Sequence, residues 1–183
     1  MTNSVKLIIL DRDGTLIEEK NYLHDPDEVK IIPGVVDGLK KLTCEGYKFI
    51  VLTNQSGIGR GYFEESDMFL VNAKISKLLS YEGIEILKFY YCPHKPEDDC
   101  KCRKPKPGMV NNACFELGLS IKDIYCVIGD KKSDVELAEN IGVKSILVLT
   151  GYGRSSLKDG VCASHVTEDL KEAADLIIKE ARK

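Results

Sequence analysis

Two aspartates one residue apart follow an apolar run near the start of the chain. The stretch reads Lys-Leu-Ile-Ile-Leu-Asp-Arg-Asp-Gly-Thr, and the aspartates are Asp11 and Asp13. Residues i and i+2 leaving a strand point to the same side, so both carboxylates can face one small volume. Two like charges that close are unfavourable unless a cation or a proton separates them. The pair therefore indicates a site that holds a cation or a proton, although Asp-Gly is also a common turn in which Asp11 would only cap a helix.

Polar residues follow two further apolar runs. Thr53 and Asn54 come after Phe49–Leu52. Their hydroxyl and backbone N–H groups could hold phosphate oxygens, or they could form an ordinary helix cap or polar turn. Asp130 comes after Ile124–Ile128 and could join the first two aspartates in a magnesium site of hard oxygen ligands.

A cluster of cysteines offers a second kind of site. Three of the seven cysteines lie within eleven residues, beside one of only three histidines, and the set is Cys92, His94, Cys100 and Cys102. Three thiolates and one imidazole form a complete tetrahedral zinc site, and four protein ligands leave no position open for chemistry. The alternative is a group of reduced thiols without metal. Against it, the intervening Lys-Pro-Glu-Asp-Asp is too polar to pack and needs an anchor.

The other four cysteines stand singly among apolar neighbours, and we expect them to be small core residues. They are Cys44, Cys114, Cys126 and Cys162. Because seven is an odd number and the chain is expected to be cytosolic, a disulfide framework is not favoured.

A basic run follows the cysteine cluster at once. Arg103 and Lys104 come directly after Cys102. A basic run is usually a solvated face and occasionally a nucleic-acid patch. Because this run is attached to a rigid zinc loop, we expect the loop to place the two cationic side chains in an anion-binding site.

The elements that must position these residues alternate regularly along the chain. Short apolar runs predict strands, and between them apolar residues recur at helical spacing. This order predicts parallel βαβ units in a three-layer α/β/α sandwich with a mostly parallel, Rossmann-like sheet, whose ligands bind at the carboxyl ends of the strands. The predicted strands are Val5–Leu10, Phe49–Leu52, Ile86–Tyr91, Ile124–Ile128 and Ile146–Leu149, each buried on both faces. The predicted helices end at Gly46, Gly83, Gly118 and Gly142, with a capping box of Ser133 and Glu136 for the fourth, and a last helix covers Glu168–Arg182.

Length and composition limit the number of domains and the classes of protein to which the chain can belong. The chain has 183 residues, is 43% hydrophobic and carries a net charge of −3. Its length predicts one domain over residues 1–183, with a small zinc loop at 92–102 and no stretch long enough for a separate cap domain. Val5–Leu10 is too short for a signal peptide or a membrane span. We therefore expect a cytoplasmic protein that binds neither nucleic acid nor membranes. The oligomeric state that we expect is a monomer.

Taken in order, four stretches resemble the four motifs of the haloacid dehalogenase superfamily of phosphotransferases. They are Asp11-Arg12-Asp13-Gly14-Thr15, Thr53-Asn54, Lys104, and Gly129-Asp130 with Asp134. The resemblance implies that Asp11 attacks phosphorus, while Asp13 protonates the leaving oxygen and later activates water. It also implies that Thr53 and Lys104 hold the phosphoryl oxygens and that Asp134 supports the site. Mg²⁺ would bind Asp11, the backbone carbonyl of Asp13, and Asp130.

A narrower resemblance covers roughly residues 5–152. With Asn21-Tyr22-Leu23-His24, Thr53–Ile58, the zinc loop and Cys102–Pro105, the chain looks like the D-glycero-D-manno-heptose 1,7-bisphosphate 7-phosphatase family. The family resemblance implies removal of the 7-phosphate in the biosynthesis of nucleotide-activated heptose, with catalytic Mg²⁺ and structural Zn²⁺. The substrate contacts that it implies are Glu19, Lys20, Asn21, Tyr22, Thr53, Asn54, Gln55, Ser56, Arg103, Lys104 and Lys131.

Two other functions compete with this interpretation. The five residues between His94 and Cys100 match a spacing seen in the related histidinol-phosphate phosphatases, whereas Lys-Pro-Gly-Met after the basic run does not favour that branch. A receiver-like signalling module, phosphorylated on a strand-end aspartate, is the non-enzymatic alternative. Asp13 argues against it, because a receiver has no need of an acid or base two residues after its phosphoacceptor.

Overall fold

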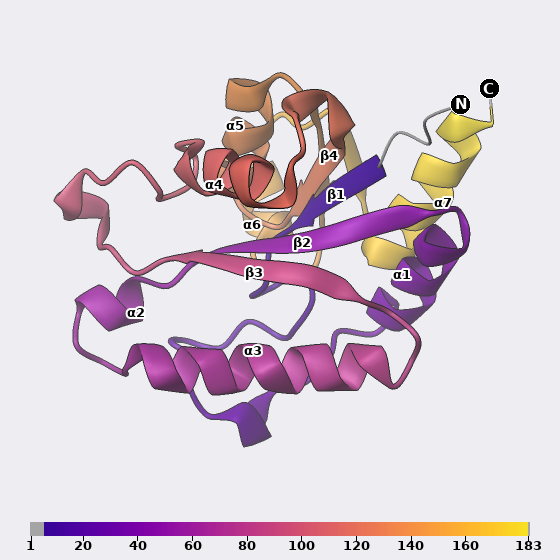
Figure 1. The fold of residues 1–183 in the computed structure, drawn as a ribbon. Coiled ribbons are helices and arrows are strands. Elements are labelled where there is room, and N and C mark those ends of the chain that lie inside the picture. Colours follow the sequence, from indigo (N-terminus) through magenta and orange to yellow (C-terminus); the bar gives the residue numbers. More distant parts are fainter. Residues whose placement is uncertain (1–5, 183) are drawn as a thin grey trace.

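Six parallel strands form one sheet at the centre of the molecule (Figure 1). The computed structural model describes residues 6–182, and Val5, the first residue of a predicted strand, lies outside them. The strand order is β3-β2-β1-β4-β5-β6. The strands are β1 (Lys6–Leu10), β2 (Tyr47–Asn54), β3 (Ile86–Cys92), β4 (Ile124–Gly129), β5 (Lys144–Val148) and β6 (His165–Thr167).

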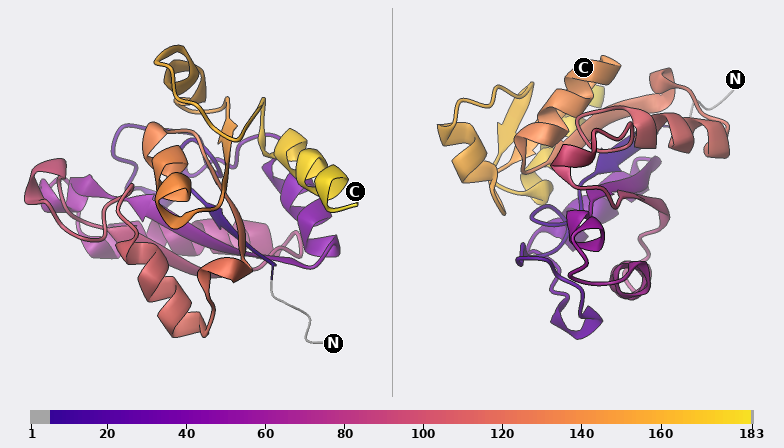
Figure 2. Two further views of the ribbon diagram at one scale, coloured as in Figure 1. Left: turned by 90° about the horizontal axis from the view of Figure 1, so that it is seen from above. Right: turned by 90° about the vertical axis from the view of Figure 1, so that its left-hand side faces the viewer.

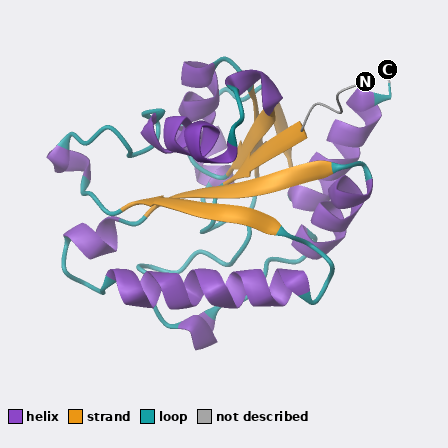
Figure 3. Ribbon diagram, in the orientation of Figure 1, coloured by secondary structure: helices purple, strands orange, loops and turns teal. Residues whose placement is uncertain are grey.

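Helices cover both faces of the sheet, as the two views of Figure 2 and the colouring of Figure 3 show. On one face α1, α3 and α7 pack on a core that includes Ile8 and Leu10. On the other face α4 and α5 pack against Leu7 and Ile9. The predicted three-layer α/β/α architecture is therefore confirmed. The helices are α1 (Val35–Cys44), α2 (Ser56–Gly59), α3 (Glu65–Ser80), α4 (Gly108–Leu117), α5 (Lys132–Ile141), α6 (Gly153–Lys158) and α7 (Leu170–Ala181).

The central strands are apolar on both faces because both layers of helices pack on them. Strand β3 differs, since it lies at the edge of the sheet. The prediction that Ile86–Tyr91 is buried on both faces is wrong: Leu87 and Lys88 are exposed. Strand β6, at the opposite edge, was not predicted. It has three residues, of which Val166 is exposed, so it gives no apolar run.

The start of α5 also corrects the sequence interpretation. The helix begins at Lys132, and the side chain of Asp134 accepts a hydrogen bond from the backbone N–H of Lys131 at 3.1 Å. The predicted capping box of Ser133 and Glu136 is wrong, because Ser133 already lies inside the helix. The cap thus turns Asp134 inward, where it is buried.

The single cysteines differ in burial. Cys126 is buried in the core, as predicted, and Cys114 is half-buried. Cys44 and Cys162 are exposed, so their prediction as core residues is wrong. Cys44 is the last residue of α1, where the helix meets solvent, and Cys162 lies in the loop before β6.

Within residues 6–182, each helix falls short of the length and apolar content that crossing a bilayer demands. No large cap domain is inserted in this part of the chain. The edge of the sheet formed by the carboxyl ends of β1, β2 and β4 is covered by loops, chiefly residues 11–34 and the cysteine loop after β3, together with the starts of α2 and α5.

Candidate active site

Three carboxylates, two from the ends of neighbouring strands and one from a helix, converge at this edge. Asp11 follows β1, Asp130 follows β4, and Asp134 lies in the first turn of α5. One carboxylate oxygen of each lies within 4.8 Å of the other two, and all three side chains are buried. The backbone N–H of Asp11 donates to Ile128 O at 2.9 Å, so the pairing of β1 with β4 fixes the first two carboxylates relative to each other.

Lys104 supplies the cation of this group. Its Nζ lies 2.6 Å from Oδ1 of Asp11 and 2.7 Å from Oδ1 of Asp134, and it donates to Leu52 O at 2.6 Å. Although burial alone would lower the pKa of Lys104, the two carboxylates raise it. Lys104 therefore stays charged, and because its side chain is buried it cannot turn into solvent away from Asp11.

Asp130 is the member of the group that lacks a cationic partner. Its Oδ2 accepts the backbone N–H of Tyr152 at 2.7 Å, whereas its buried Oδ1 has no hydrogen-bond partner in the described chain. Burial, and then the charge of Asp11, raise the pKa of Asp130 to about 8. By contrast, Lys104 and Lys131 lower the pKa of Asp11 against the effect of its burial. An unpaired buried carboxylate oxygen beside an ionised carboxylate fits a hard divalent cation such as Mg²⁺.

A close approach of two loops shapes this part of the site. Gly14 has a φ of +89°, and a Cβ there would lie 2.1 Å from Oδ2 of Asp130. A Cβ at Gly151 would lie 2.3 Å from the same oxygen. Thr150 Oγ1 also donates to Gly14 O at 2.6 Å. The loop after β5 was not among the predicted site residues, although Thr-Gly-Tyr-Gly at the end of a predicted strand was a signal for it.

The side chain of Asp13 lies apart from the carboxylate group. Arg12 donates to both of its oxygens, from Nε to Oδ2 at 2.9 Å and from Nη2 to Oδ1 at 3.0 Å. Gln55 Nε2 donates to Oδ2 at 2.9 Å, and Thr53 Oγ1 lies 3.4 Å from that oxygen. These contacts engage both carboxylate oxygens of Asp13. Arg12 was not predicted as a site residue.

Two cavities meet at Asp13. An outer cavity is lined by the loop after β1 and by the start of α2, and an inner cavity is lined by Asp11, by Thr53 and by the basic run. The residues shared by both are Asp13, Asn54, Ser56 and Lys131. The structure brings all the predicted substrate contacts to these walls. Glu19, Lys20, Asn21, Tyr22 and Gln55 line the outer cavity, and Thr53, Arg103 and Lys104 line the inner one.

Several of these residues are also tied to one another. The side-chain amide of Asn54 donates to Lys104 O at 3.2 Å and accepts from Lys104 N at 3.0 Å. These two hydrogen bonds hold the backbone of Lys104 in place. Lys131 Nζ lies 2.6 Å from Oε2 of Glu19 and 5.0 Å from the ring centre of Tyr152. Tyr152, which was not predicted, therefore forms part of the outer wall.

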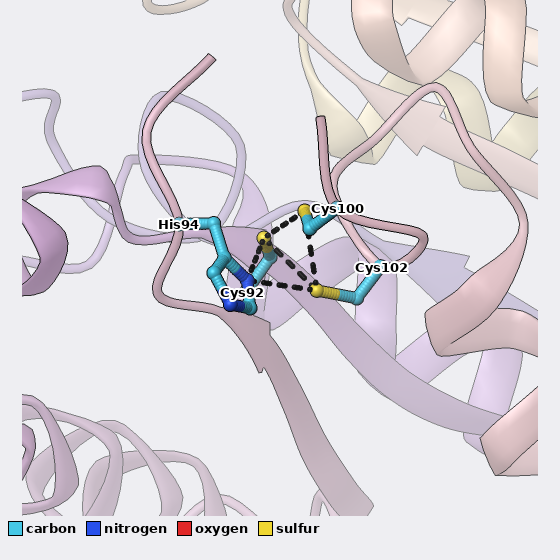
Figure 4. Close-up of side chains that lie close together, drawn as sticks. All are labelled: Cys92, His94, Cys100 and Cys102. Atoms are coloured by element: carbon cyan, nitrogen blue, oxygen red, sulfur yellow. Dashed lines mark hydrogen bonds between the residues drawn. The ribbon is translucent and has the colours of Figure 1, made fainter. Parts of the chain in front are cut away.

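The cysteine cluster has the geometry of a metal site (Figure 4). Sγ of Cys102 lies 3.2 Å from Cys92 Sγ, 3.5 Å from Cys100 Sγ and 3.3 Å from Nδ1 of His94. A tetrahedral zinc ion with Zn–S bonds of about 2.3 Å separates its sulfurs by about 3.8 Å. Although burial opposes it, the N–H of Arg103 and the neighbouring thiols lower the pKa of Cys100 to about 7. The donor set and its spacing fit Zn²⁺.

The cysteine cluster and the basic run are one unit. The backbone N–H of Arg103 donates to Cys100 Sγ at 3.4 Å, and Arg103 Nη1 donates to His94 O at 3.2 Å. The loop thus positions both Arg103 and the next residue, Lys104, whose ammonium group reaches Asp11.

Comparison with known proteins shows the family to which this chain is related. A family model described as "HAD-hyrolase-like" matches residues 101–173. The chain is 39% identical over 158 residues to the D-glycero-beta-D-manno-heptose-1,7-bisphosphate 7-phosphatase of Pseudomonas putida, covering 86% of this chain and 90% of that protein. It is 36% identical over 171 residues to the D-glycero-alpha-D-manno-heptose-1,7-bisphosphate 7-phosphatase of Photorhabdus laumondii, covering 89% of this chain and 93% of that protein.

A solved structure matches over nearly the whole chain. The D,D-heptose 1,7-bisphosphate phosphatase from B. bronchiseptica, crystallised with magnesium and phosphate, superposes with a TM-score of 0.87 at 32% sequence identity. The match covers 96% of this chain and 99% of that chain.

Proposed function

Because this chain belongs to the D-glycero-D-manno-heptose-1,7-bisphosphate 7-phosphatase family of haloacid dehalogenase-like hydrolases, we propose that it removes the 7-phosphate of D-glycero-D-manno-heptose 1,7-bisphosphate. The single observation that carries the proposal is the contact of Lys104 with Asp11 beside the unpaired oxygen of Asp130. This arrangement supplies a nucleophile, a phosphoryl-binding cation and a place for a divalent metal at one point.

The residues divide the reaction among them. Asp11 attacks phosphorus and forms an aspartyl phosphate, while Asp13 gives a proton to the departing sugar oxygen. Lys104 and Thr53 bind the phosphoryl oxygens, and Lys104 offsets the charge that builds up on them. Asp134 keeps Lys104 in place through their ion pair at 2.7 Å.

Two metals complete the proposal. Asp11, Asp130 and the backbone carbonyl of Asp13 would hold Mg²⁺, which neutralises charge on the transferring phosphoryl group when bound. Cys92, His94, Cys100 and Cys102 would hold Zn²⁺, whose closed coordination makes it structural. Its effect on the reaction is exerted through Arg103 and Lys104, which the loop positions.

The substrate is a small phosphorylated sugar, with its heptose part in the outer cavity and the reacting phosphate in the inner one. We further propose that residues 1–183 act as one domain, as a cytoplasmic monomer that needs no nucleic acid or membrane.

Release of inorganic phosphate from a panel of phosphorylated metabolites tests the function. The heptose bisphosphate should be hydrolysed repeatedly in the presence of Mg²⁺ and not in EDTA. Asp11→Asn should abolish turnover, because an amide cannot form the aspartyl phosphate. The matched control is Asp159→Asn, which changes a carboxylate at the C-terminal end of α6, outside both cavities. Turnover by Asp11→Asn at the rate of that control would refute the assignment of the nucleophile.

A further inference from the structure

Arg12 has an unusual environment for an arginine. Its side chain is 1% exposed and, within the described chain, donates hydrogen bonds to two residues. Two of its nitrogens, Nε and Nη2, donate hydrogen bonds to the carboxylate of Asp13, and Nη1 donates to Oδ1 of Asn72 at 3.0 Å. A bidentate guanidinium–carboxylate pair fixes direction as well as distance. Arg12 therefore sets where the Asp13 carboxyl points.

Asn72 in turn fixes Arg12. It lies in the middle of α3 and is buried, and its own Nδ2 lies 2.9 Å from the sulfur of Met68. Helix α3 does not need this polar link to pack, because Val71, Ile75 and Leu79 already anchor it in the core. A buried asparagine and a buried arginine are costly to place without a role. Their common target, Asp13, indicates what that role is.

The position of Asp13 is where a proton donor is needed. It lies on the boundary between the outer cavity and the inner cavity. Under the proposed function the sugar occupies the first and the reacting phosphate the second. The oxygen that joins them must then cross this boundary, within reach of the Asp13 carboxyl.

We propose that Arg12, held by Asn72, is a positioning residue that holds the Asp13 carboxyl at the bridging oxygen of the phosphoester. This inference rests on the proposed function. As the bond from Asp11 to phosphorus forms and the bond from phosphorus to the sugar oxygen breaks, Asp13 gives its proton to that oxygen. The carboxylate left on Asp13 is paired at once with the guanidinium. Asp13 then takes a proton from the water whose oxygen displaces Asp11 from phosphorus, and inorganic phosphate is released.

Comparison of two leaving groups separates this role from a purely structural one. A sugar alkoxide needs a proton to leave, whereas 4-nitrophenolate is a stable anion that leaves without one. The value of kcat/KM reports the steps up to release of the leaving group. Arg12→Met should therefore lower kcat/KM about tenfold to a hundredfold for the heptose bisphosphate, within the range that general acid catalysis supplies, and much less for 4-nitrophenyl phosphate.

A second variant covers the case in which Arg12→Met does not fold. Asn72→Leu keeps Arg12 but removes the hydrogen bond that holds it. The ratio of kcat/KM for the heptose bisphosphate to kcat/KM for 4-nitrophenyl phosphate should therefore fall by about threefold to tenfold. Leu79→Met changes a buried residue about two turns farther along the same helix, and it should leave the ratio unchanged. An unchanged ratio in Asn72→Leu, or an equal loss on both substrates in folded Arg12→Met, overturns the inference.

Measurement of Asp13→Asn on the same two substrates separates failure of this inference from failure of the proposed function. If Asp13→Asn shows the leaving-group dependence and the Arg12 and Asn72 variants do not, only the positioning role falls. If Asp13→Asn loses activity equally on both substrates, the assignment of Asp13 as the acid falls, and the role of Arg12 falls with it.

Discussion

Lys104 and Asp11 are 93 positions apart in the chain, yet Nζ of Lys104 lies 2.6 Å from Oδ1 of Asp11. The lysine comes from the cysteine loop after β3, and the aspartate ends β1. The contact therefore ties the proposed structural metal site to the proposed nucleophile. It also leaves two buried carboxylates dependent on one ammonium group, since Asp134 shares it.

Replacement of Lys104 should affect both stability and catalysis. In Lys104→Met, Asp11 and Asp134 lose the cation between them, and breaking a buried ion pair costs about 3–5 kcal/mol of the free energy of unfolding. Loss of a preorganised cation at the phosphoryl group should lower kcat by about 10²–10³-fold. Urea unfolding and phosphate release measure the two effects. Lys106→Met is the control, because Lys106 is exposed and pairs only with Asp99 in the described chain. A Lys104 variant as active as this control would contradict the account.

Zinc should be bound tightly, with one ion per chain. In zinc-finger peptides such binding is worth roughly 10–16 kcal/mol at neutral pH, so its removal should disorder the cysteine loop. Activity should then fall although zinc takes no part in the chemistry, because the loop carries Arg103 and Lys104. Elemental analysis and phosphate release before and after chelation measure this. Cys102→Ser should lose zinc and activity, whereas Cys162→Ser, exposed and outside the cluster, should lose neither. Zinc-free purified protein with full activity would refute the prediction.

Stability of the metal-free protein should depend on pH. Burial and the charge of Asp11 raise the pKa of Asp130 to about 8 in the folded protein, from an ordinary value of 3.8. Between these values the folded state binds more protons than the unfolded state, so the free energy of unfolding falls as pH rises from about 4 to about 8. Asp134, whose pKa burial also raises, acts in the same direction.

Thermal unfolding with and without Mg²⁺ tests this dependence. The Tm of metal-free protein should be lower at about pH 8 than at about pH 5, and Mg²⁺ should raise Tm more at the higher pH, where fewer protons compete for the carboxylates. Asp130→Asn, which cannot titrate, should weaken both effects. A metal-free Tm that rises over this interval would show that Asp130 is not the dominant titrating group.

Arg103 should favour substrates with a second phosphate. We assign Lys104 to the reacting phosphoryl group, whereas the guanidinium of Arg103 makes one hydrogen bond, to His94 O, in the described chain. A charge-assisted hydrogen bond of about 1.5–3 kcal/mol corresponds to roughly a tenfold to hundredfold preference for a bisphosphate. Arg103→Ala should lower kcat/KM for the heptose bisphosphate by that factor and for simple monophosphates far less. Lys101→Ala, at an exposed position outside both cavities, is the control. Equal losses on both kinds of substrate would remove this role.

The fold could be predicted where a strand is buried on both faces of the sheet. Strands β1, β2 and β4 are apolar on both faces because helices cover both, and their runs were visible in the sequence. Burial changes at the edges of the sheet, and there the prediction failed: β3 exposes Leu87 and Lys88, and β6 was missed. The short helices α2 and α6 span too few residues to show a helical period.

The candidate site was predictable where polar residues follow apolar runs. Asp11, Thr53 and Asp130 were found in this way, and the spacing of the cysteines predicted the cysteine cluster. Arg12 was missed because its partner Asn72 lies in α3, and no local pattern shows that a loop and a distant helix will meet. Tyr152 was missed although Thr-Gly-Tyr-Gly follows a predicted strand, because the group that meets Asp130 is its backbone N–H, which the residue type does not reveal.

The relative efficiency on two substrates tests the central claim most directly. Purified, metal-loaded protein should be assayed for kcat/KM on D-glycero-D-manno-heptose 1,7-bisphosphate and on histidinol phosphate, with ³¹P NMR to identify the phosphate that remains on the sugar. The account predicts higher efficiency on the bisphosphate, with the 7-phosphate removed and the 1-phosphate retained. More efficient hydrolysis of histidinol phosphate, or removal of the 1-phosphate first, would contradict it.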